Sequence, residues 1–156
     1  MATHLKAGDP APGFSGTTTH GKTVSLGDFR GRKLVIYFYP MDDTPGCTKQ
    51  ACSLRDHNAE IAARGAAILG VSTQGEESHR RFSAKFNLDF PLLADTDGAV
   101  GRAYGTLGGS GLLSKLKSAA GMADRVTFVI DADGRIAHVI DRPDVARHAE
   151  EVLALL

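Results

Sequence analysis

The sequence lacks several features by which whole classes of protein are recognised. Positive and negative side chains balance, 18 Lys and Arg against 18 Asp and Glu, so no net charge favours nucleic acid or an anionic membrane. No stretch approaches the roughly 18 consecutive apolar residues of a membrane span. The first ten residues also lack the apolar segment typical of a signal peptide. We therefore expect a cytoplasmic protein.

Cysteine is scarce, and the pattern of the two that occur is informative. Cys47 and Cys52 are five residues apart, and the Cys-x-x-Cys motif of thioredoxin-type dithiol oxidoreductases is absent. A zinc site would need four ligands, whereas Cys47, Cys52 and His57 do not share a helix face. No Gly-x-Ser-x-Gly or Gly-x-Gly-x-x-Gly fingerprint occurs and no Walker A loop is expected, so hydrolase and nucleotide-binding classes lack support. The cysteine pair indicates redox chemistry rather than a disulfide framework.

The segment before Cys47 predicts a strand followed by a helix. Leu34 to Tyr39 is the most apolar run in the first half of the chain and is typical of a buried strand. The run ends at Pro40, and a new element starts at Thr44 and Pro45, which suit the N-cap and the first position of a helix.

Cys47 is therefore expected in the first turn of a helix that extends to about Arg64. Unpaired backbone N–H groups and the positive end of the helix dipole stabilise an anion there, which favours a reactive thiolate. The Thr44 hydroxyl can donate to that sulfur or to an oxygen bound beside it. The alternative is a buried structural cysteine, because free Cys is among the most buried residue types.

Cys52 restricts the redox chemistry further. On a regular helix, residues five apart differ by about 140° in direction and their Cα atoms are about 8.6 Å apart. A disulfide requires Cα atoms within roughly 7 Å, so the pair cannot bond while the helix is intact. Either the two cysteines never bond, or the first turns unwind after Cys47 is oxidised and Cys52 resolves it.

These residues carry a resemblance to a known family. The pattern Pro40-x-x-x-Thr44-x-x-Cys47 resembles the active-site signature of the peroxiredoxins. The run from Thr44 to Thr48, with Cys52 following, is similar to the subgroup called peroxiredoxin Q or bacterioferritin comigratory protein. Further similarity in the right order covers nearly the whole chain, including Gly70 to Ser72, Phe82 to Asp95, Tyr104-Gly105 and Arg125 to Asp131.

The resemblance implies a thiol-dependent peroxidase acting on hydrogen peroxide and organic hydroperoxides. Cys47 becomes a sulfenic acid, Cys52 forms an intramolecular disulfide with it, and thioredoxin or a similar dithiol protein restores both thiols. No metal, flavin or haem is implied. Because the resolving cysteine lies in the same helix, a monomer is expected, with a dimer as the alternative. A thiol redox sensor using the same disulfide, and a holdase-type binding protein, are the rival functions.

The resemblance also assigns supporting residues. Arg125 matches the active-site arginine, whose guanidinium can address both the thiolate and a peroxide oxygen, although an arginine at a strand start is ordinarily a solvated flank. Pro40 shields Cys47 from water. Gln50 stands where the family commonly has Glu, which orients the arginine; the alternative is a helix-surface residue. We expect Asp42 and Asp43 to be solvated, and His57 and His79 to lie on helix surfaces or boundaries.

The expected fold class is α/β, in one domain spanning 1–156. The resemblance implies a thioredoxin-like fold with a central mixed sheet, flanking helices and an N-terminal hairpin. The strands are expected at 14–18, 22–26, 34–39, 66–72, 91–95, 125–131 and 135–141, and the helices at 44–64, 76–87, 99–104 and 144–155.

One segment departs from the subgroup. Residues 105–121 form a Gly- and Ser-rich insertion with a possible short helix that includes Leu112 to Leu116. We expect a surface insertion that packs its leucines locally. The alternative is a contact for another subunit or for a reductant protein.

Overall fold

A five-stranded mixed sheet forms the centre of the molecule. The computed structural model describes residues 3–108, 116 and 120–156. The strand order is β5 (Leu92–Ala94), β4 (Ala66–Ser72), β3 (Lys33–Phe38), β6 (Val126–Ile130) and β7 (Ile136–Ile140). β3 pairs in parallel with β4 and antiparallel with β6. The expected mixed sheet is confirmed.

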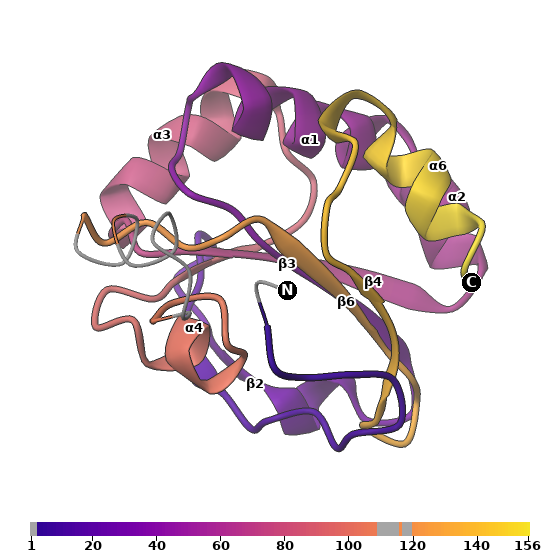
Figure 1. Ribbon diagram of the computed structural model, residues 1–156. Coiled ribbons are helices and arrows are strands. Elements are labelled where there is room, and N and C mark those ends of the chain that lie inside the picture. Colours follow the sequence, from indigo (N-terminus) through magenta and orange to yellow (C-terminus); the bar gives the residue numbers. More distant parts are fainter. Residues whose placement is uncertain (1–2, 109–115, 117–119) are drawn as a thin grey trace.

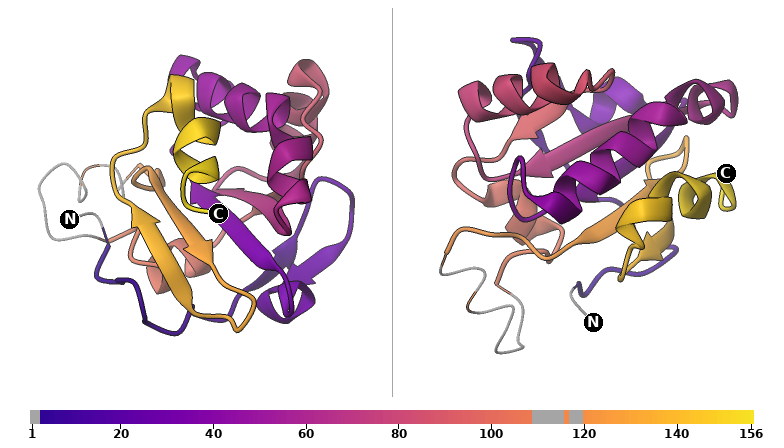
Figure 2. Two further views of the ribbon diagram at one scale, coloured as in Figure 1. Left: turned by 90° about the vertical axis from the view of Figure 1, so that its right-hand side faces the viewer. Right: turned by 90° about the horizontal axis from the view of Figure 1, so that it is seen from above.

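Helices cover both faces of this sheet (Figure 1). On one face lie α1 (Pro45–Asp56), α2 (Asn58–Ala63), α3 (Glu76–Phe86) and α6 (His148–Leu153). On the other face lie α4 (Ala99–Ala103), the 3₁₀ helix η1 (Leu26–Phe29) and the N-terminal hairpin of β1 (Ser15–Thr17) and β2 (Thr23–Ser25). Two further views show α6 beside α1 (Figure 2).

Side chains of β3 supply both cores in strict alternation. Leu34, Ile36 and Phe38 belong to the apolar cluster under α4 and the hairpin. Val35 and Tyr37 belong to the cluster that contains Cys47 and the inner residues of α1, α3 and α6. Successive residues of a strand point to opposite faces, so a strand buried on both sides must be apolar, as this one is from Leu34 to Phe38.

Two expected helices are each divided. The helix predicted from 44 to 64 breaks at His57, whose φ and ψ are −115° and 10°. The His57 ring nitrogen Nδ1 lies 3.0 Å from the Ser53 carbonyl oxygen, the group that a continuous helix would bond to the His57 backbone N–H. The last helix likewise consists of a 3₁₀ turn, η2 (Val145–Arg147), and α6.

The predicted hairpins are confirmed, and one of them explains a misleading sequence pattern. Residues 16–23 match the Gly-x-x-x-x-Gly-Lys-Thr pattern of phosphate-binding loops. That motif works at a strand-to-helix turn, whereas this segment runs from β1 through a tight turn at Gly21 (φ 72°) into the antiparallel β2. A strand rather than a helix follows Lys22 directly, so the hairpin does not have the geometry of a phosphate-binding loop.

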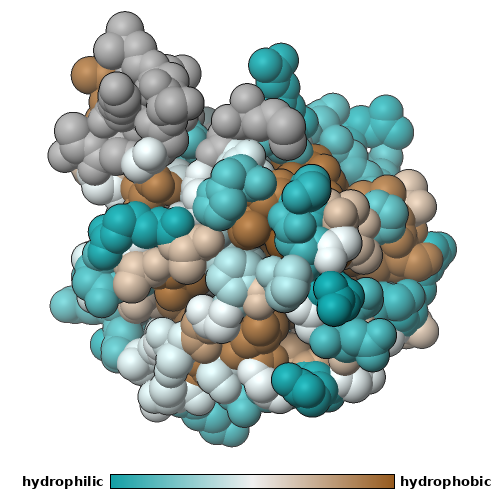
Figure 3. Space-filling view, turned by 60° about the horizontal axis from the view of Figure 1, so that its bottom comes forward, coloured by the Kyte–Doolittle hydropathy of each residue, from teal (hydrophilic) through white to brown (hydrophobic). Residues whose placement is uncertain are grey.

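The expected short helix with Leu112 to Leu116 lies outside the described residues except for Leu116, whose side chain is exposed. No helix among the described residues is both long and apolar enough to cross a membrane. Figure 3 shows the face that carries α4 and the hairpin, where apolar residues are interspersed with hydrophilic ones.

Candidate active site

Cys47 lies in the first turn of α1, as the sequence predicts. Thr44 is the N-cap, with extended φ and ψ of −92° and 156°, and Pro45 follows at the first helical position. Only 1% of Cys47 is exposed, at the boundary between the start of α1 and the sheet. The sulfur is therefore held near the positive end of a helix and away from bulk water.

The Thr44 hydroxyl has a different partner from the one expected. It donates to the Met41 carbonyl oxygen at 3.2 Å rather than to the Cys47 sulfur, and it makes no capping bond to the helix. This bond closes the turn through Asp43, whose φ is 59°. Because the hydroxyl does not cap the helix, the backbone N–H groups of the first turn remain available to an anion.

Arg125, directly before β6, reaches the thiol from the sheet. The antiparallel register places Val126 opposite Phe38, so Arg125 and the chain entering the cysteine loop lie at the same end of the sheet. Arg125 Nη2 donates to Cys47 Sγ at 3.4 Å. A Cβ on Gly46 would lie 3.2 Å from the same nitrogen, so glycine there gives the guanidinium its space. The solvated-flank alternative is wrong for this arginine.

Gln50 orients the guanidinium from the next turn of α1. Its side-chain oxygen Oε1 accepts from Arg125 Nη1 at 2.6 Å, and the residue is fully buried. The helix-surface alternative is therefore wrong. The other end of the amide is less well placed: Gln50 Nε2 and the hydroxyl of Tyr37 are buried without a hydrogen-bond partner among the described residues.

Cys52 lies five residues further along α1 and is partly exposed. Both thiols are free, and both belong to the same continuous helix. The structure thus has the reduced arrangement in which the spacing forbids a disulfide. Pro40 is half-buried and lies in the loop to α1, two residues after the end of β3 at Phe38.

A second buried group near Cys47 has no obvious signal in the sequence. His148, fully buried on α6, lies with Nε2 at 2.9 Å from Thr127 Oγ1 and Nδ1 at 3.0 Å from a carboxylate oxygen of Glu151. Burial lowers the pKa of His148 despite the nearby Glu151. Burial likewise raises the pKa of Tyr37, whose ring packs edge-on against His148. The floor of the site is therefore uncharged at neutral pH.

The expectation that Asp42 is solvated and that His79 lies on a helix surface or boundary is wrong. Both are buried, and Asp42 accepts hydrogen bonds from Tyr39 Oη at 2.6 Å, Ser78 Oγ at 2.8 Å and His79 Nδ1 at 2.6 Å. Burial acts to raise the pKa of Asp42, but these hydrogen bonds together with the charge of His79 hold the pKa below its usual value. His57 is half-buried, as a boundary residue should be.

The described residues contain no group of three or more His, Cys, Asp and Glu side chains arranged to hold a metal ion. The site consists instead of a thiol, a guanidinium, an amide and the start of a helix. This set can stabilise a thiolate and, beside it, negative charge that develops on a bound oxygen.

Comparisons with known proteins agree with this geometry. The AhpC/TSA family model matches residues 7–139. Peroxiredoxin Bcp of Escherichia coli strain K12 is 43% identical over 149 residues, covering 96% of this chain and 94% of that protein. Peroxiredoxin Bcp of Bacillus subtilis strain 168 is 37% identical over 156 residues, with 97% and 95% covered.

Solved structures agree as well. Peroxidoxin BcpB of Mycobacterium tuberculosis superposes with a TM-score of 0.84 at 34% identity, covering 97% of this chain and 96% of that one. The bacterioferritin comigratory protein of Xanthomonas campestris, studied for its alkyl peroxide reduction activity, has a TM-score of 0.80 at 34% identity, with 90% and 88% covered. This chain therefore belongs to the AhpC/TSA family and is a peroxiredoxin, a thiol-dependent peroxidase.

Proposed function

We propose that Cys47 is the peroxidatic cysteine and that Arg125 and the first-turn backbone N–H groups stabilise the reaction. Thr44 joins them when its hydroxyl turns from the Met41 carbonyl oxygen to a bound peroxide. The observation that carries this assignment is the contact of Arg125 with both the Cys47 sulfur and the Gln50 oxygen. A thiolate with a fixed guanidinium beside it needs no separate general base, and the neutral floor of Tyr37 and His148 adds no competing negative charge.

In the first step, the Cys47 thiolate attacks the terminal oxygen of a peroxide ROOH. The S–O bond forms as the O–O bond breaks, the sulfur is oxidised to a sulfenic acid, and the alkoxide or hydroxide that leaves takes up a proton to become ROH or water. Negative charge grows on the leaving oxygen, so donors aimed there lower the barrier most. Arg125 is the donor best placed to stabilise that charge, because its planar guanidinium can donate to the sulfur and to a peroxide oxygen at the same time.

In the second step, Cys52 attacks the Cys47 sulfenic acid, forming an intramolecular disulfide and releasing water. Since both cysteines lie on one intact helix, the start of α1 must unwind first. A dithiol protein then reduces the disulfide by exchange and is itself oxidised. We assign this role to thioredoxin or a similar protein.

The remaining assignments follow from this cycle. Hydrogen peroxide and organic hydroperoxides are the proposed substrates, consistent with the alkyl peroxide reduction studied in the Xanthomonas campestris relative. A monomer in a single domain suffices, because both cysteines belong to one helix. Two cysteines five residues apart indicate redox chemistry rather than a disulfide framework, and we propose the cytoplasm as the compartment.

The test is peroxide consumption driven by a thioredoxin system, with native protein, Cys47→Ser and Cys52→Ser. We expect complete loss of activity in Cys47→Ser. Cys52→Ser should oxidise rapidly once and then fail to turn over with thioredoxin. Unchanged peroxide reactivity in Cys47→Ser would refute the assignment. Rapid single oxidation of the native protein without turnover by any of several dithiol reductants would indicate a redox sensor instead.

A further inference from the structure

The loop between β3 and α1 is fixed to α3 by a buried polar cluster that the peroxidase chemistry does not use. We call Asp42, Tyr39, Ser78 and His79 the loop clamp. Asp42 belongs to the loop and accepts from all three others, two of which lie on α3. The Asp42 backbone N–H adds a bond to Gln74 Oε1 at 3.0 Å.

Both ring nitrogens of His79 take part in the loop clamp. His79 Nε2 lies 3.0 Å from the Leu93 carbonyl oxygen, which can only accept, and Nδ1 faces a carboxylate oxygen of Asp42. Each ring nitrogen therefore faces an acceptor, and the bond between His79 and the Asp42 carboxylate is charge-assisted. Because the His79 side chain is fully buried and that of Asp42 is only 4% exposed, removing His79 leaves the Asp42 charge buried without this partner.

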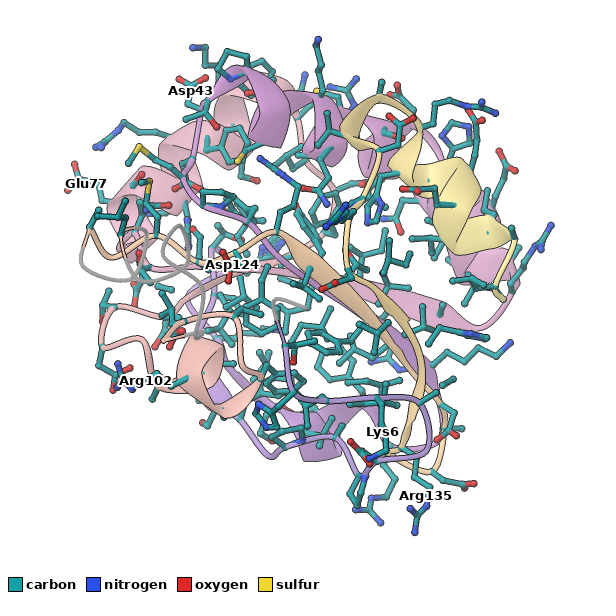
Figure 4. All side chains as sticks on the ribbon, in the orientation of Figure 1. Lys6, Asp43, Glu77, Arg102, Asp124 and Arg135 are labelled. Carbon is teal, nitrogen blue, oxygen red and sulfur yellow. The ribbon has the colours of Figure 1, made fainter. Side chains whose placement is uncertain are left out.

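The other end of the reactive segment is fixed too. Ser53 Oγ accepts from the Ala149 backbone N–H at 3.0 Å, which ties α1 to α6. Arg55 Nη1 donates to the Phe86 carbonyl oxygen at 2.6 Å, which ties α1 to the end of α3. Both cysteines lie between these ties and the loop clamp. Figure 4 labels Asp43 beside the start of α1 and Glu77 at the start of α3, on the same side of the molecule.

The chain is long enough to form the disulfide with both ends held. From Asp42 to Cys47 the extended chain reaches about 17 Å, and a disulfide adds about 5.5 Å between Cα atoms. One further residue gives about 26 Å in total from Asp42 to Ser53. In the folded state the same span is at most about 23 Å, given the rise of a helix and the short loop before it.

We propose that the loop clamp is the N-terminal boundary of the unwinding that brings Cys47 to Cys52, and that His79 and Asp42 are positioning residues for the resolving step. This inference rests on the proposed function, because it needs Cys52 to be the resolving cysteine. The clamp holds α1 in the folded arrangement that reacts with peroxide and limits the conformations of the unwound segment. Weakening it favours unwinding, and therefore faster disulfide formation and less overoxidation of Cys47.

The experiment compares native protein with His79→Leu after a single pulse of hydrogen peroxide. Acid quenching, thiol alkylation and mass spectrometry then follow sulfenic acid, disulfide and sulfinic acid. In His79→Leu we expect disulfide formation to be about tenfold faster, because releasing the clamp frees the backbone of about one further residue in the unwound segment. The rate of Cys47 oxidation should change less than about threefold, because Arg125 and Gln50 are untouched. The sulfinic fraction at high peroxide should fall correspondingly.

Two further variants sharpen the result. Asp42→Asn retains the shape of the side chain. A neutral His79 can accept from the new amide through Nδ1 while Nε2 still donates, so disulfide formation should accelerate less than in His79→Leu. Asp43→Asn is the matched control: it removes only the exposed ion pair with Lys85 and keeps a residue that tolerates positive φ. It should alter neither step by more than about twofold.

The outcomes are distinguishable. Native protein that forms no Cys47–Cys52 disulfide would refute the resolving role of Cys52 in the proposed function. Native protein that forms the disulfide, with an unchanged rate in His79→Leu, would refute the clamp alone. A slower oxidation of Cys47 by peroxide in His79→Leu, with no change in the rate of disulfide formation, would also refute the clamp. If His79→Leu does not fold, Ser78→Ala removes one donor to Asp42 and should accelerate disulfide formation about threefold; no acceleration there would count against the proposal.

Discussion

The contact between Gln50 and Arg125 offers a quantitative test of how the guanidinium is used. The 2.6 Å bond joins a charged donor to a fully buried acceptor. Such a bond contributes about 1.5–3 kcal/mol, and each 1.36 kcal/mol corresponds to about a tenfold change in rate. If the bond serves to position Arg125 in the transition state, Gln50→Leu should slow Cys47 oxidation about 10- to 100-fold.

A double-mutant cycle separates positioning from other effects of the substitution. Arg125→Met removes the donor that faces the sulfur and should cost about 10²- to 10³-fold in rate, as for loss of one donor to a developing oxyanion. In the Arg125→Met background, Gln50→Leu should then add almost nothing. The coupling free energy is expected to approach the full contribution of the bond, about 1.5–3 kcal/mol.

The assay measures the second-order rate constant for Cys47 oxidation by hydrogen peroxide. The protein competes for the peroxide with a haem peroxidase, whose absorption spectrum shows how much of the peroxide the haem enzyme has consumed. A Cys52→Ser background isolates the first step. Thermal unfolding of each variant checks that the fold persists. Additive losses from the two substitutions would refute the reasoning, because Gln50 would then act independently of Arg125. A rate within threefold of native for Arg125→Met would refute the role of the guanidinium itself.

Two other changes test the surroundings of the thiol. Gly46→Ala should slow Cys47 oxidation severalfold, because the new Cβ lies 3.2 Å from Arg125 Nη2. The free energy of unfolding should rise by up to about 1 kcal/mol, because Ala is the better helix former. An unchanged oxidation rate would show that the guanidinium does not need the space that Gly46 leaves. Burial lowers the pKa of His148, so the unfolded chain binds a proton at this residue more tightly than the folded chain does. The stability contributed by neutral His148 is therefore complete above about pH 6.5 and is lost as the pH falls below that value. His148→Gln should flatten that part of the stability–pH curve in denaturant titrations; a slope equal to the native one would contradict the assignment.

Local signals in the sequence predict the elements that carry the chemistry. The apolar run of β3, the Pro40 break, and Thr44-Pro45 at the start of α1 are all adjacent in the chain, so their structure depends little on distant residues. They place Cys47 in the first turn without any knowledge of the fold. The hairpin of β6 and β7 follows for the same reason from the turn at Gly134, whose φ is 85°.

Contacts between distant residues could not be predicted in the same way. Asp42 and His79 are 37 residues apart, and the sequence offers only the position of His79 on the apolar face of α3 with Phe82. A carboxylate in a turn is solvated by default, and only the approach of three donors makes its burial favourable. The break at His57 does not follow from helix propensities, because these do not describe a ring nitrogen that competes for the Ser53 carbonyl oxygen.

The start of α1 has to satisfy two opposing requirements, and Gln50 affects both. The helix must be folded to react with peroxide and unwound to form the proposed disulfide. The buried Gln50 Nε2 has no partner among the described residues, which costs about 1–3 kcal/mol in the folded state and is relieved when the helix unwinds. Gln50→Glu removes this unsatisfied donor and gives Arg125 a charged acceptor, so the folded helix gains relative to the unwound one.

We therefore expect Gln50→Glu to slow disulfide formation about three- to tenfold after a peroxide pulse and to increase the sulfinic acid formed at high peroxide. The rate of Cys47 oxidation should stay within about threefold of native, because an acceptor for Arg125 remains in place. Gln50→Leu, which also removes the unsatisfied amide but leaves Arg125 without its acceptor, is the comparison that isolates the strengthened pair. Faster disulfide formation in Gln50→Glu would show that the desolvation free energy of the buried carboxylate exceeds the stabilisation from its pairing with Arg125. It would also show that the unsatisfied amide does not set the stability of this turn.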